Sequence, residues 1–365
     1  MPRILNSGPL QQASIPPSGR LRRWTRITGL VYIAGIILLT ALFRGFGERW
    51  WLLSPLLFFP IQLWVAPLAL LIPAAWKFER RLLPLLAFTL LLALFGIAGF
   101  RFGTGAQFPT PGAPALTVLT YNTGEDNNTS VEPFLRSQMP DLIMLQAVVR
   151  HADFRHLRYP GCHVKELDEF VLISRFPILN SKRISTGKPQ WKKSLAAAFT
   201  IDWNGRAITV YTVHVPTLRR EFDRLTGKKG PQKSKRSRVA TFRDDMRARV
   251  ELNEHFARML AAEPGPLIVA GDFNMPASGY LHAQYASRLT DAFGVTGRGF
   301  GFTFPGFDPY LPTFFGTWLR LDYVFCNSAW KPLSCTVEQG RASQHRAVAA
   351  TFQLKGTADQ APKQK

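Results

Sequence analysis

The sequence predicts two parts, a helical membrane region and an α/β domain in which two mixed β-sheets pack face to face with helices outside. Three observations predict this fold class. Three long apolar runs lie within the first hundred residues, and a Gly- and Pro-rich segment follows at residues 102–114. From residue 115 to residue 354, short β-rich runs alternate with amphipathic helical patterns. Strand hairpins mixed with helices are typical of layered sheets covered by helices.

The apolar runs cover residues 27–43, 50–76 and 82–100. About 20 apolar residues span a bilayer as a helix, so the first and third runs are good candidates. The second run contains four prolines, which kink a helix or favour a re-entrant segment, so both outcomes stay open. We expect a basic N-terminal segment over residues 1–26 and a transmembrane region of about three helices over residues 27–101.

The charge of the chain is strongly basic, with 45 Lys and Arg against 24 Asp and Glu, a net charge of +21. This balance favours anionic partners, namely nucleic acid, phospholipid headgroups or phosphorylated small molecules. Basic residues gather before the first apolar run and between the second and third runs. The positive-inside rule then predicts an integral protein of the inner or plasma membrane with its C-terminal domain outside the cytoplasm. This orientation assumes three membrane crossings, and it would not hold if the second run were re-entrant.

The α/β domain is predicted from its local patterns. Strands are expected at 115–122, 142–145, 170–174, 195–203, 206–215, 267–270, 322–325 and 348–354. Capping-box spacing of Thr129 and Glu132 predicts a short helix, and an amphipathic stripe predicts a second over 242–261, with Asp244 in its first turn. Cys326 and Cys335 could pair across a hairpin, but free thiols are the simpler expectation. The tail at 355–365 is expected to be disordered.

Polar residues of a recurring kind stand where five of these strands end or begin. Taken alone, each is weak, because an Asp-x-Asn after a strand is usually a turn and a single His is usually structural. Together and in this order they form a specific pattern: Asn122, His214, Asp272 and Asn274 in GDFN, Asp322 in RLDYVF, and His345 in SQHRAV.

This pattern resembles the endonuclease/exonuclease/phosphatase superfamily, which includes deoxyribonuclease I, abasic-site endonucleases, sphingomyelinases and inositol polyphosphate phosphatases. The resemblance covers residues 115–354, includes the segment SRFPI at 174–178, and extends to membrane-anchored bacterial members. It implies a four-layer αββα sandwich and the hydrolysis of phosphoester bonds with Mg²⁺ or Mn²⁺.

The resemblance also implies roles for four catalytic residues. Asp272 would orient or deprotonate the attacking water, and Asn274 would hold that water or a phosphate oxygen. His214 and His345 would donate to the phosphoryl oxygens, on which charge builds during cleavage.

Metal ligation is implied for Asn122 and Asp322, since hard cations prefer oxygen ligands. The chain departs from the family pattern at two positions. Ala147 replaces the family's metal-binding glutamate, and Gln344 replaces an aspartate that orients the histidine. Glu125, just beyond Asn122, is a further candidate ligand, although a solvated loop residue is the simpler interpretation. We therefore expect weak or altered metal binding.

A basic segment follows the strand that carries His214. It could funnel a polyanion into the site, lie on anionic lipid, or be a solvated loop. The candidate substrate-binding residues in it are Lys228, Lys229, Lys233, Lys235 and Arg236.

Two functions remain open from the sequence. The first is a membrane-anchored, metal-dependent phosphodiesterase or nuclease-like hydrolase that acts on a phosphate-bearing substrate beside the lipid bilayer, with no obligate protein partner. The second is a non-catalytic module that binds phosphate or polyanions through a degraded site. The retained polar positions favour the hydrolase, whereas Ala147 and Gln344 favour the binding module.

Overall fold

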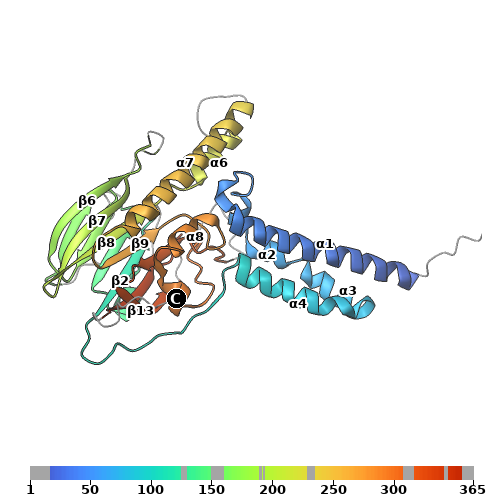
Figure 1. Ribbon diagram of the computed structural model, residues 1–365, viewed down its shortest axis with the longest axis horizontal. Helices are drawn as coiled ribbons and strands as arrows, with labels where there is room; N and C mark the ends of the chain where they lie inside the picture. The colour runs from blue at the N-terminus through green and yellow to red at the C-terminus, as the bar shows by residue number, and fades with distance from the viewer. Residues whose placement is uncertain are drawn as a thin grey trace, which may run out of the picture.

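The computed structural model describes residues 17–124, 130–148, 160–188, 191, 194–227, 235–306, 316–340 and 344–355. It contains a bundle of apolar helices on one side and a layered α/β sandwich on the other (Figure 1).

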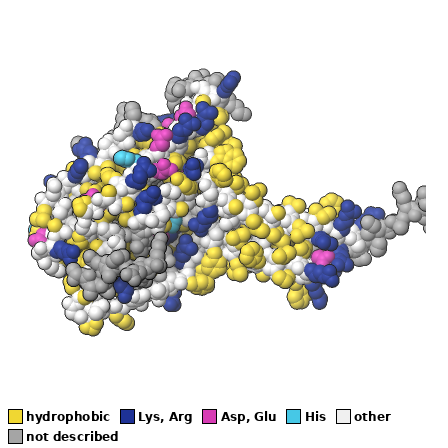
Figure 2. Space-filling model, in the orientation of Figure 1, with side chains coloured by type: hydrophobic (Ala, Val, Ile, Leu, Met, Phe, Trp, Pro, Cys, Tyr) yellow, Lys and Arg dark blue, Asp and Glu magenta, His cyan; other side chains and the backbone are white. Residues whose placement is uncertain are grey.

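The N-terminal part consists of α-helices with three short 3₁₀ turns, η1 to η3, and one π-helical turn, η4, among its described residues. Its elements are α1 (Pro17–Gly45), η1 (Gly47–Arg49), η2 (Leu56–Phe58), α2 (Ile61–Val65), α3 (Leu68–Phe78), η3 (Arg80–Leu82), α4 (Leu83–Leu92) and η4 (Ala93–Ile97). Three segments are long and apolar enough to cross a membrane: Gly19–Gly45, Ile61–Phe78 and Arg80–Ile97. Figure 2 shows hydrophobic side chains along this part, with Lys and Arg gathered at its end remote from the sandwich.

The second apolar run divides into two structures. Its first residues form the turns that contact the sandwich, and the helical segment begins only after Pro60. Pro67 separates α2 from α3, as expected for a residue that cannot continue the helical hydrogen bonds. The segment ends at the same end of the bundle as the start of α1, because Arg22 contacts Glu79 at 2.9 Å. The helical segment after Pro60 therefore runs along the bundle to the end where α1 begins.

Two six-stranded mixed sheets form the sandwich. The first has the order β13 (Trp330–Val337), β14 (Val348–Leu354), β2 (Ala115–Asn122), β3 (Leu142–Gln146), β5 (Phe170–Ser174) and β4 (His163–Leu167). The second has the order β10 (Thr290–Asp291), β12 (Asp322–Cys326), β9 (Leu267–Asp272), β8 (Arg206–His214), β7 (Ser194–Trp203) and β6 (Ile178–Ser185). Only β2–β3 and β8–β9 are parallel among these neighbours.

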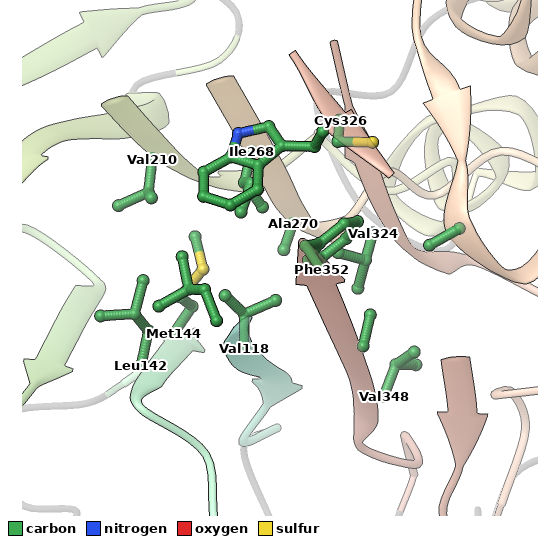
Figure 3. Packing of buried hydrophobic residues seen from close by; sticks show 14 of the residues in the cluster. Val118, Leu142, Met144, Val210, Ile268, Ala270, Val324, Cys326, Val348 and Phe352 are labelled. Atoms are coloured by element: carbon green, nitrogen blue, oxygen red, sulfur yellow. The ribbon is translucent and has the colours of Figure 1, made fainter. Parts of the chain in front are cut away.

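Helices cover the outer faces of both sheets. Helix α5 (Glu132–Gln138) packs on the first sheet, and α7 (Lys235–Ala261) and α8 (Tyr280–Ala286) pack on the second. Helix α6 (Arg219–Thr226) packs on α7, α9 (Ala292–Thr296) contributes to the core between the sheets, and a short pair joins β1 (Arg101–Phe102) to β11 (Arg298–Gly299). Apolar side chains fill the space between the sheets, where Val118 and Met144 of one sheet face Val210 and Ile268 of the other (Figure 3). The αββα prediction is confirmed.

Several local predictions are confirmed and others are corrected. The Asn204–Gly205 turn has φ of 54° and 81°, the left-handed pair that a two-residue hairpin requires. The predicted helix over 242–261 begins earlier, at Lys235, so Asp244 lies inside it and not in its first turn. Thr129 lies outside the described residues, and Ser130 instead accepts a hydrogen bond from the Glu132 N–H at 3.1 Å.

Cys326 and Cys335 do not pair across a hairpin, so the expectation of free thiols is confirmed. Cys326 ends β12 and Cys335 lies in β13, and these strands belong to different sheets. Both thiols are free and buried, and burial raises the pKa of Cys326 to about 12. They act as small apolar groups within the core between the sheets.

Candidate active site

The polar strand ends meet at one edge of the sandwich because of how the strands pair. In the first sheet, Asn122 of β2 lies opposite Gln146 of the parallel strand β3. In the second sheet, His214 of β8 and Asp322 of β12 both lie opposite Asp272 of β9. The edge is therefore built from positions more than a hundred residues apart in the chain.

The GDFN turn has a reason for each of its four residues. A Cβ at Gly271 would lie 2.1 Å from the Val213 carbonyl oxygen, so only glycine allows β9 to approach β8 this closely. Phe273 is fully buried and anchors the turn. Asn274 has φ of 49°, a left-handed conformation that Asn tolerates better than most residues, and its N–H donates to Asp272 Oδ1 at 2.8 Å.

Asp272 is the centre of the site. Its side chain is 1% exposed, and its Oδ2 accepts hydrogen bonds from Asn122 Nδ2 and Asn274 Nδ2, both at 2.9 Å. The Nε2 atoms of His214 and His345 lie 3.7 and 3.8 Å from the same oxygen. Amide and imidazole nitrogens thus surround one carboxylate oxygen, which fixes the direction in which this carboxylate can accept a proton.

Each histidine is held by a carboxylate at its other ring nitrogen. Glu169 Oε1 lies 3.0 Å from His214 Nδ1, and Asp322 Oδ2 lies 2.9 Å from His345 Nδ1. A carboxylate at Nδ1 fixes the orientation of the ring. The site therefore contains two histidine–carboxylate pairs, with both Nε2 atoms directed toward Asp272.

Glu169 is a site residue that the sequence prediction missed. It lies in the turn between β4 and β5, and its carbonyl accepts the Val148 N–H at 3.1 Å, just beyond β3. The only local signal was an acidic pair, Asp168–Glu169, directly before the buried run FVLIS. Nothing in that signal indicates that β5 pairs with β3 and so brings Glu169 to the catalytic edge.

The effect predicted for Gln344 needs correction. We expected His345 to lack an orienting carboxylate because glutamine stands at position 344. In the structure Asp322 contacts the ring instead, from the neighbouring sheet. Glutamine at position 344 therefore does not deprive His345 of a charged partner.

At the end of β3, Gln146 has a structural role. Gln146 is fully buried, and its Nε2 donates to Thr120 Oγ1 at 2.9 Å and to Thr212 Oγ1 of the opposite sheet at 2.7 Å. It thereby ties the two sheets together beneath the site. Ala147 follows with φ of 56°, and its carbonyl accepts the Thr123 hydroxyl at 3.1 Å. Its methyl group supplies no ligand.

The acidic residues can still hold a cation. Asp272, Asp322 and His345 each offer one ligand atom, and these atoms lie within 4.8 Å of one another. Asp322 Oδ1 is buried and has no hydrogen-bond partner among the described residues. Burial and the neighbouring Asp272 raise the pKa of Asp322, which a positive ion between the two carboxylates would reverse. The donor set suits a hard divalent cation.

Two predicted ligands contribute differently. The Asn122 carbonyl oxygen accepts the Gly124 N–H at 3.0 Å, so its amide is used to hold Asp272 and its own turn. Glu125 lies outside the described residues. Glu169 does not share a cation with Asp272, because the imidazole ring of His214 stands between the two carboxylates.

Of the five basic candidate residues, only Arg236 is described with its side chain, and it does not lie beside Asp272. Lys228, Lys229 and Lys233 lie outside the described residues, and nothing is described of the Lys235 side chain. Arg236 is exposed in the first turn of α7. Its position is 13 residues before Arg249, the α7 residue that contacts the GDFN turn, which at 1.5 Å per residue is roughly 20 Å along the helix.

Arg249 is a second residue that the sequence prediction missed. It is 2% exposed, and it donates through Nη2 to the Asn274 carbonyl at 2.7 Å and through Nη1 to the Pro216 carbonyl. It thereby joins the turn after β9 to the segment after β8. Burial lowers the pKa of the guanidinium, while Glu221, Glu48 and Asp272 raise it.

Comparison with known proteins shows the family of the chain. The sequence profile of the Endonuclease/Exonuclease/phosphatase family matches residues 119–345, and the chain belongs to this family. Its enzymes cleave phosphoester bonds and depend on divalent metal ions. Comparison with curated proteins gave no match.

Three of the solved structures that are similar to this chain are from a bacterium, human and a nematode. An endonuclease/exonuclease/phosphatase family protein from Bacteroides thetaiotaomicron is 15% identical with a TM-score of 0.46, covering 67% of this chain and 99% of that chain. The human Nocturnin catalytic domain with bound sulfate is 16% identical with a TM-score of 0.45, covering 67% and 96%. Truncated Caenorhabditis elegans TDP2 is 16% identical with a TM-score of 0.46, covering 66% and 98%.

Proposed function

We propose that this chain is a membrane-anchored phosphoester hydrolase that acts with Mg²⁺ or Mn²⁺. One observation carries the proposal: a buried Asp272 is held by two amides and flanked by two histidines, each paired with a carboxylate. A merely structural aspartate has no need of two oriented imidazoles. Groups that hold, donate and accept protons around one point are what phosphoester cleavage requires.

Each residue has a role that follows from its contacts. Asp272 accepts a proton from the attacking water, because its Oδ2 faces the site and the two amides fix its direction. His214 and His345, held in position by Glu169 and Asp322, donate to the phosphoryl oxygens as negative charge builds. Asn274 keeps the turn in place through its own N–H and through Nδ2, which also donates to the Val215 carbonyl at 2.9 Å.

A divalent cation would be held by the carboxylates of Asp272 and Asp322, and His345, whose Nε2 donates to a phosphoryl oxygen, would lie beside it rather than coordinate it. It would supply positive charge to the phosphoryl oxygens and to the leaving group. The carboxylate that the family places at position 147 is absent, so we expect a lower metal affinity than a site with that glutamate.

The membrane part supports anchoring and an orientation. The segments Gly19–Gly45, Ile61–Phe78 and Arg80–Ile97 have the length and composition of membrane spans. The end of this bundle remote from the sandwich carries seven Lys and Arg residues, against three at the end near it. By the positive-inside rule, the remote end lies in the cytoplasm and the sandwich lies outside it. We propose the inner or plasma membrane as the location.

The alternative is a binding module without turnover, which Ala147 favours. A direct assay separates the two. The full-length protein in detergent is incubated with a chromogenic phosphodiester, a phosphomonoester and plasmid DNA, with Mg²⁺ or Mn²⁺ and with or without chelator. The variants are Asp272→Ala, Ala147→Glu and, as a matched control, Asp244→Ala, whose side chain is 61% exposed on α7.

Metal-dependent hydrolysis that is lost in Asp272→Ala and kept in Asp244→Ala supports the hydrolase. If the native chain is inactive on all three substrates while Ala147→Glu gains activity, the binding module is the correct reading. Activity that survives in Asp272→Ala would also contradict the assigned role of Asp272.

A further inference from the structure

The loop between the first two candidate spans is built into the sandwich. This docking loop, residues 46–60, contains Glu48, whose side chain is 2% exposed and whose Oε2 accepts the Leu281 N–H at 3.1 Å. A Cβ on Gly47 would lie 2.5 Å from the Tyr280 nitrogen, so the two backbones are in direct contact. The docking loop is therefore a packed part of the domain rather than a free tether.

Aromatic contacts extend the same interface. The Trp51 ring packs edge-on against Phe242 of α7, with ring centroids 6.2 Å apart. Trp318 Nε1 donates to the Phe58 carbonyl at 3.0 Å, and the Phe58 side chain packs on the cluster that contains Leu321. Three separate segments of the sandwich thus close around one loop of the membrane part.

The residues around the docking loop include neighbours in sequence of three catalytic residues. Leu218, in the cluster with Trp51, follows shortly after His214. Tyr280 follows shortly after Asn274, and Leu321 directly precedes Asp322. The docking loop is therefore adjacent to the ends of β8 and β9 and to the start of β12.

Direct contacts link the docking-loop side to the catalytic residues. The ring of Phe304, which belongs to the Phe58 cluster, lies 4.8 Å from the His345 ring. Arg249, held near Glu48, donates to the Asn274 carbonyl. The catalytic edge is thus one layer of side chains away from the membrane part.

The path of the linker also places the catalytic edge at the end of the sandwich near the membrane part. After β1, the Gln107 N–H donates to the Leu333 carbonyl, and the Thr110 N–H donates to Gln353 Oε1 at 3.1 Å, beside the start of β2. The linker thus runs along the sandwich away from the helices, as Figure 1 shows. Strand β2 then runs back and brings Asn122 to the edge near the membrane part.

The exposed side chains of the docking loop mark the level of the bilayer surface. Large apolar residues at the domain end of the helices are Phe46 at 54% exposed, Trp50 at 42%, Leu52 at 50% and Phe59 at 46%. Aromatic side chains gather at membrane–water interfaces, so these four exposed residues place the docking loop at headgroup depth. Arg44 and Arg49 are exposed at the same level and suit lipid phosphates.

The sandwich is also attached at a second place. Arg101 of β1 pairs with Gly299 of β11, and the Phe100 and Phe300 rings pack with centroids 4.9 Å apart. Two attachments, at the docking loop and at β1, restrict how far the catalytic edge can turn away from the bilayer.

From this placement we infer that the substrate is the headgroup phosphoester of a lipid in the membrane that anchors the chain. The inference rests on the proposed hydrolase function and names its substrate class. An edge held at headgroup depth meets lipid phosphates at high local concentration, whereas a dissolved polyanion must approach against the anionic bilayer surface.

The test compares one headgroup in and out of a bilayer. Full-length protein is reconstituted into phosphatidylcholine vesicles that carry phosphatidylglycerol, phosphatidylethanolamine and phosphatidic acid. Their products are measured by mass spectrometry in Mg²⁺ or Mn²⁺. The same total phosphate is supplied in parallel as the deacylated, water-soluble headgroup compounds, and as isotope-labelled lipid in separate protein-free vesicles. Asp272→Ala is the blank, and Asp244→Ala is the matched control.

We expect at least one lipid of the protein's own vesicle to be cleaved at least about tenfold faster than its soluble counterpart and than the same lipid in separate vesicles. Equal or faster cleavage of the soluble compounds, or equal cleavage in separate vesicles, overturns the inference. Cleavage of the chromogenic diester without cleavage of any lipid overturns the inference but leaves the hydrolase standing. No cleavage of any phosphoester removes the proposed function itself.

Discussion

Replacing Glu169 by glutamine tests whether the His214 pair acts in catalysis. Glu169 Oε1 lies 3.0 Å from His214 Nδ1, and the side chains of Glu169 and His214 are 10% and 17% exposed, so solvent screens the pair only partly. Glutamine keeps an acceptor oxygen of the same reach but carries no charge. The Glu169→Gln variant therefore removes the electrostatic part of the contact and leaves its shape.

The magnitude follows from the two kinds of hydrogen bond. A bond to a charged group contributes about 1.5–3 kcal/mol and a neutral one about 0.5–1.5 kcal/mol, so the substitution loses about 1–2 kcal/mol. If this difference acts on the protonated His214 of the transition state, kcat/KM falls about 5- to 30-fold, with most of the loss in kcat.

The assay is hydrolysis of a chromogenic phosphodiester by the full-length chain, at a temperature where circular dichroism shows both proteins folded. Glu166→Gln, an exposed change in the adjacent strand β4, is the matched control and should leave kcat/KM unchanged. Wild-type kinetics in Glu169→Gln would refute the reasoning. So would a loss as complete as that of Asp272→Ala, because Glu169 is assigned only to position His214.

Three further changes have defined outcomes. Ala147→Glu restores a carboxylate at the strand end and should raise Mn²⁺ affinity at least about tenfold, measured by calorimetry; unchanged affinity would mean that the side chain does not reach the cation. Arg249→Met should destabilise the chain by about 3–5 kcal/mol in chemical unfolding, because it leaves buried carboxylates without their counter-charge, whereas Arg247→Met on the exposed face should stay within about 0.5 kcal/mol. Asp291→Asn breaks a buried ion pair of 2.7 Å with Arg320 and should cost a similar 3–5 kcal/mol. Burial alone would raise the pKa of Asp291, but Arg320 and a neighbouring histidine hold it well below its usual range. The ionised carboxylate therefore stabilises the fold at neutral pH, and this stabilisation is lost as the pH falls through that low value. A wild-type unfolding temperature that does not fall with acidic pH would contradict this.

Local patterns in the sequence were sufficient for the elements and for much of the site. The spans follow from apolar length, and the strands follow from short β-rich runs. GDFN could be read directly, because glycine at a close approach and asparagine in a left-handed turn leave a local signature. The order of the polar strand ends was enough to predict the family, and the profile match over residues 119–345 confirms it.

The partners of the catalytic residues could not be read in this way. His345 meets Asp322 and His214 meets Glu169 only because the two facing sheets bring their strand ends to one edge. The prediction from Gln344 was wrong for this reason, since a neighbour in sequence was taken as the partner of the ring. Sequence separation gives no signal about which strand will lie beside which.

The sequence by itself determined that apolar spans precede a layered hydrolase-type domain, because periodicity and turn chemistry act over a few residues. Only the tertiary structure decided how the two parts meet. Glu48 lies just before the apolar run that the sequence indicates as a second span, yet it is buried in the sandwich close to Arg249, more than two hundred residues away. Such a contact exists only after the helices and sheets have packed, and it sets the catalytic edge close to the apolar helices.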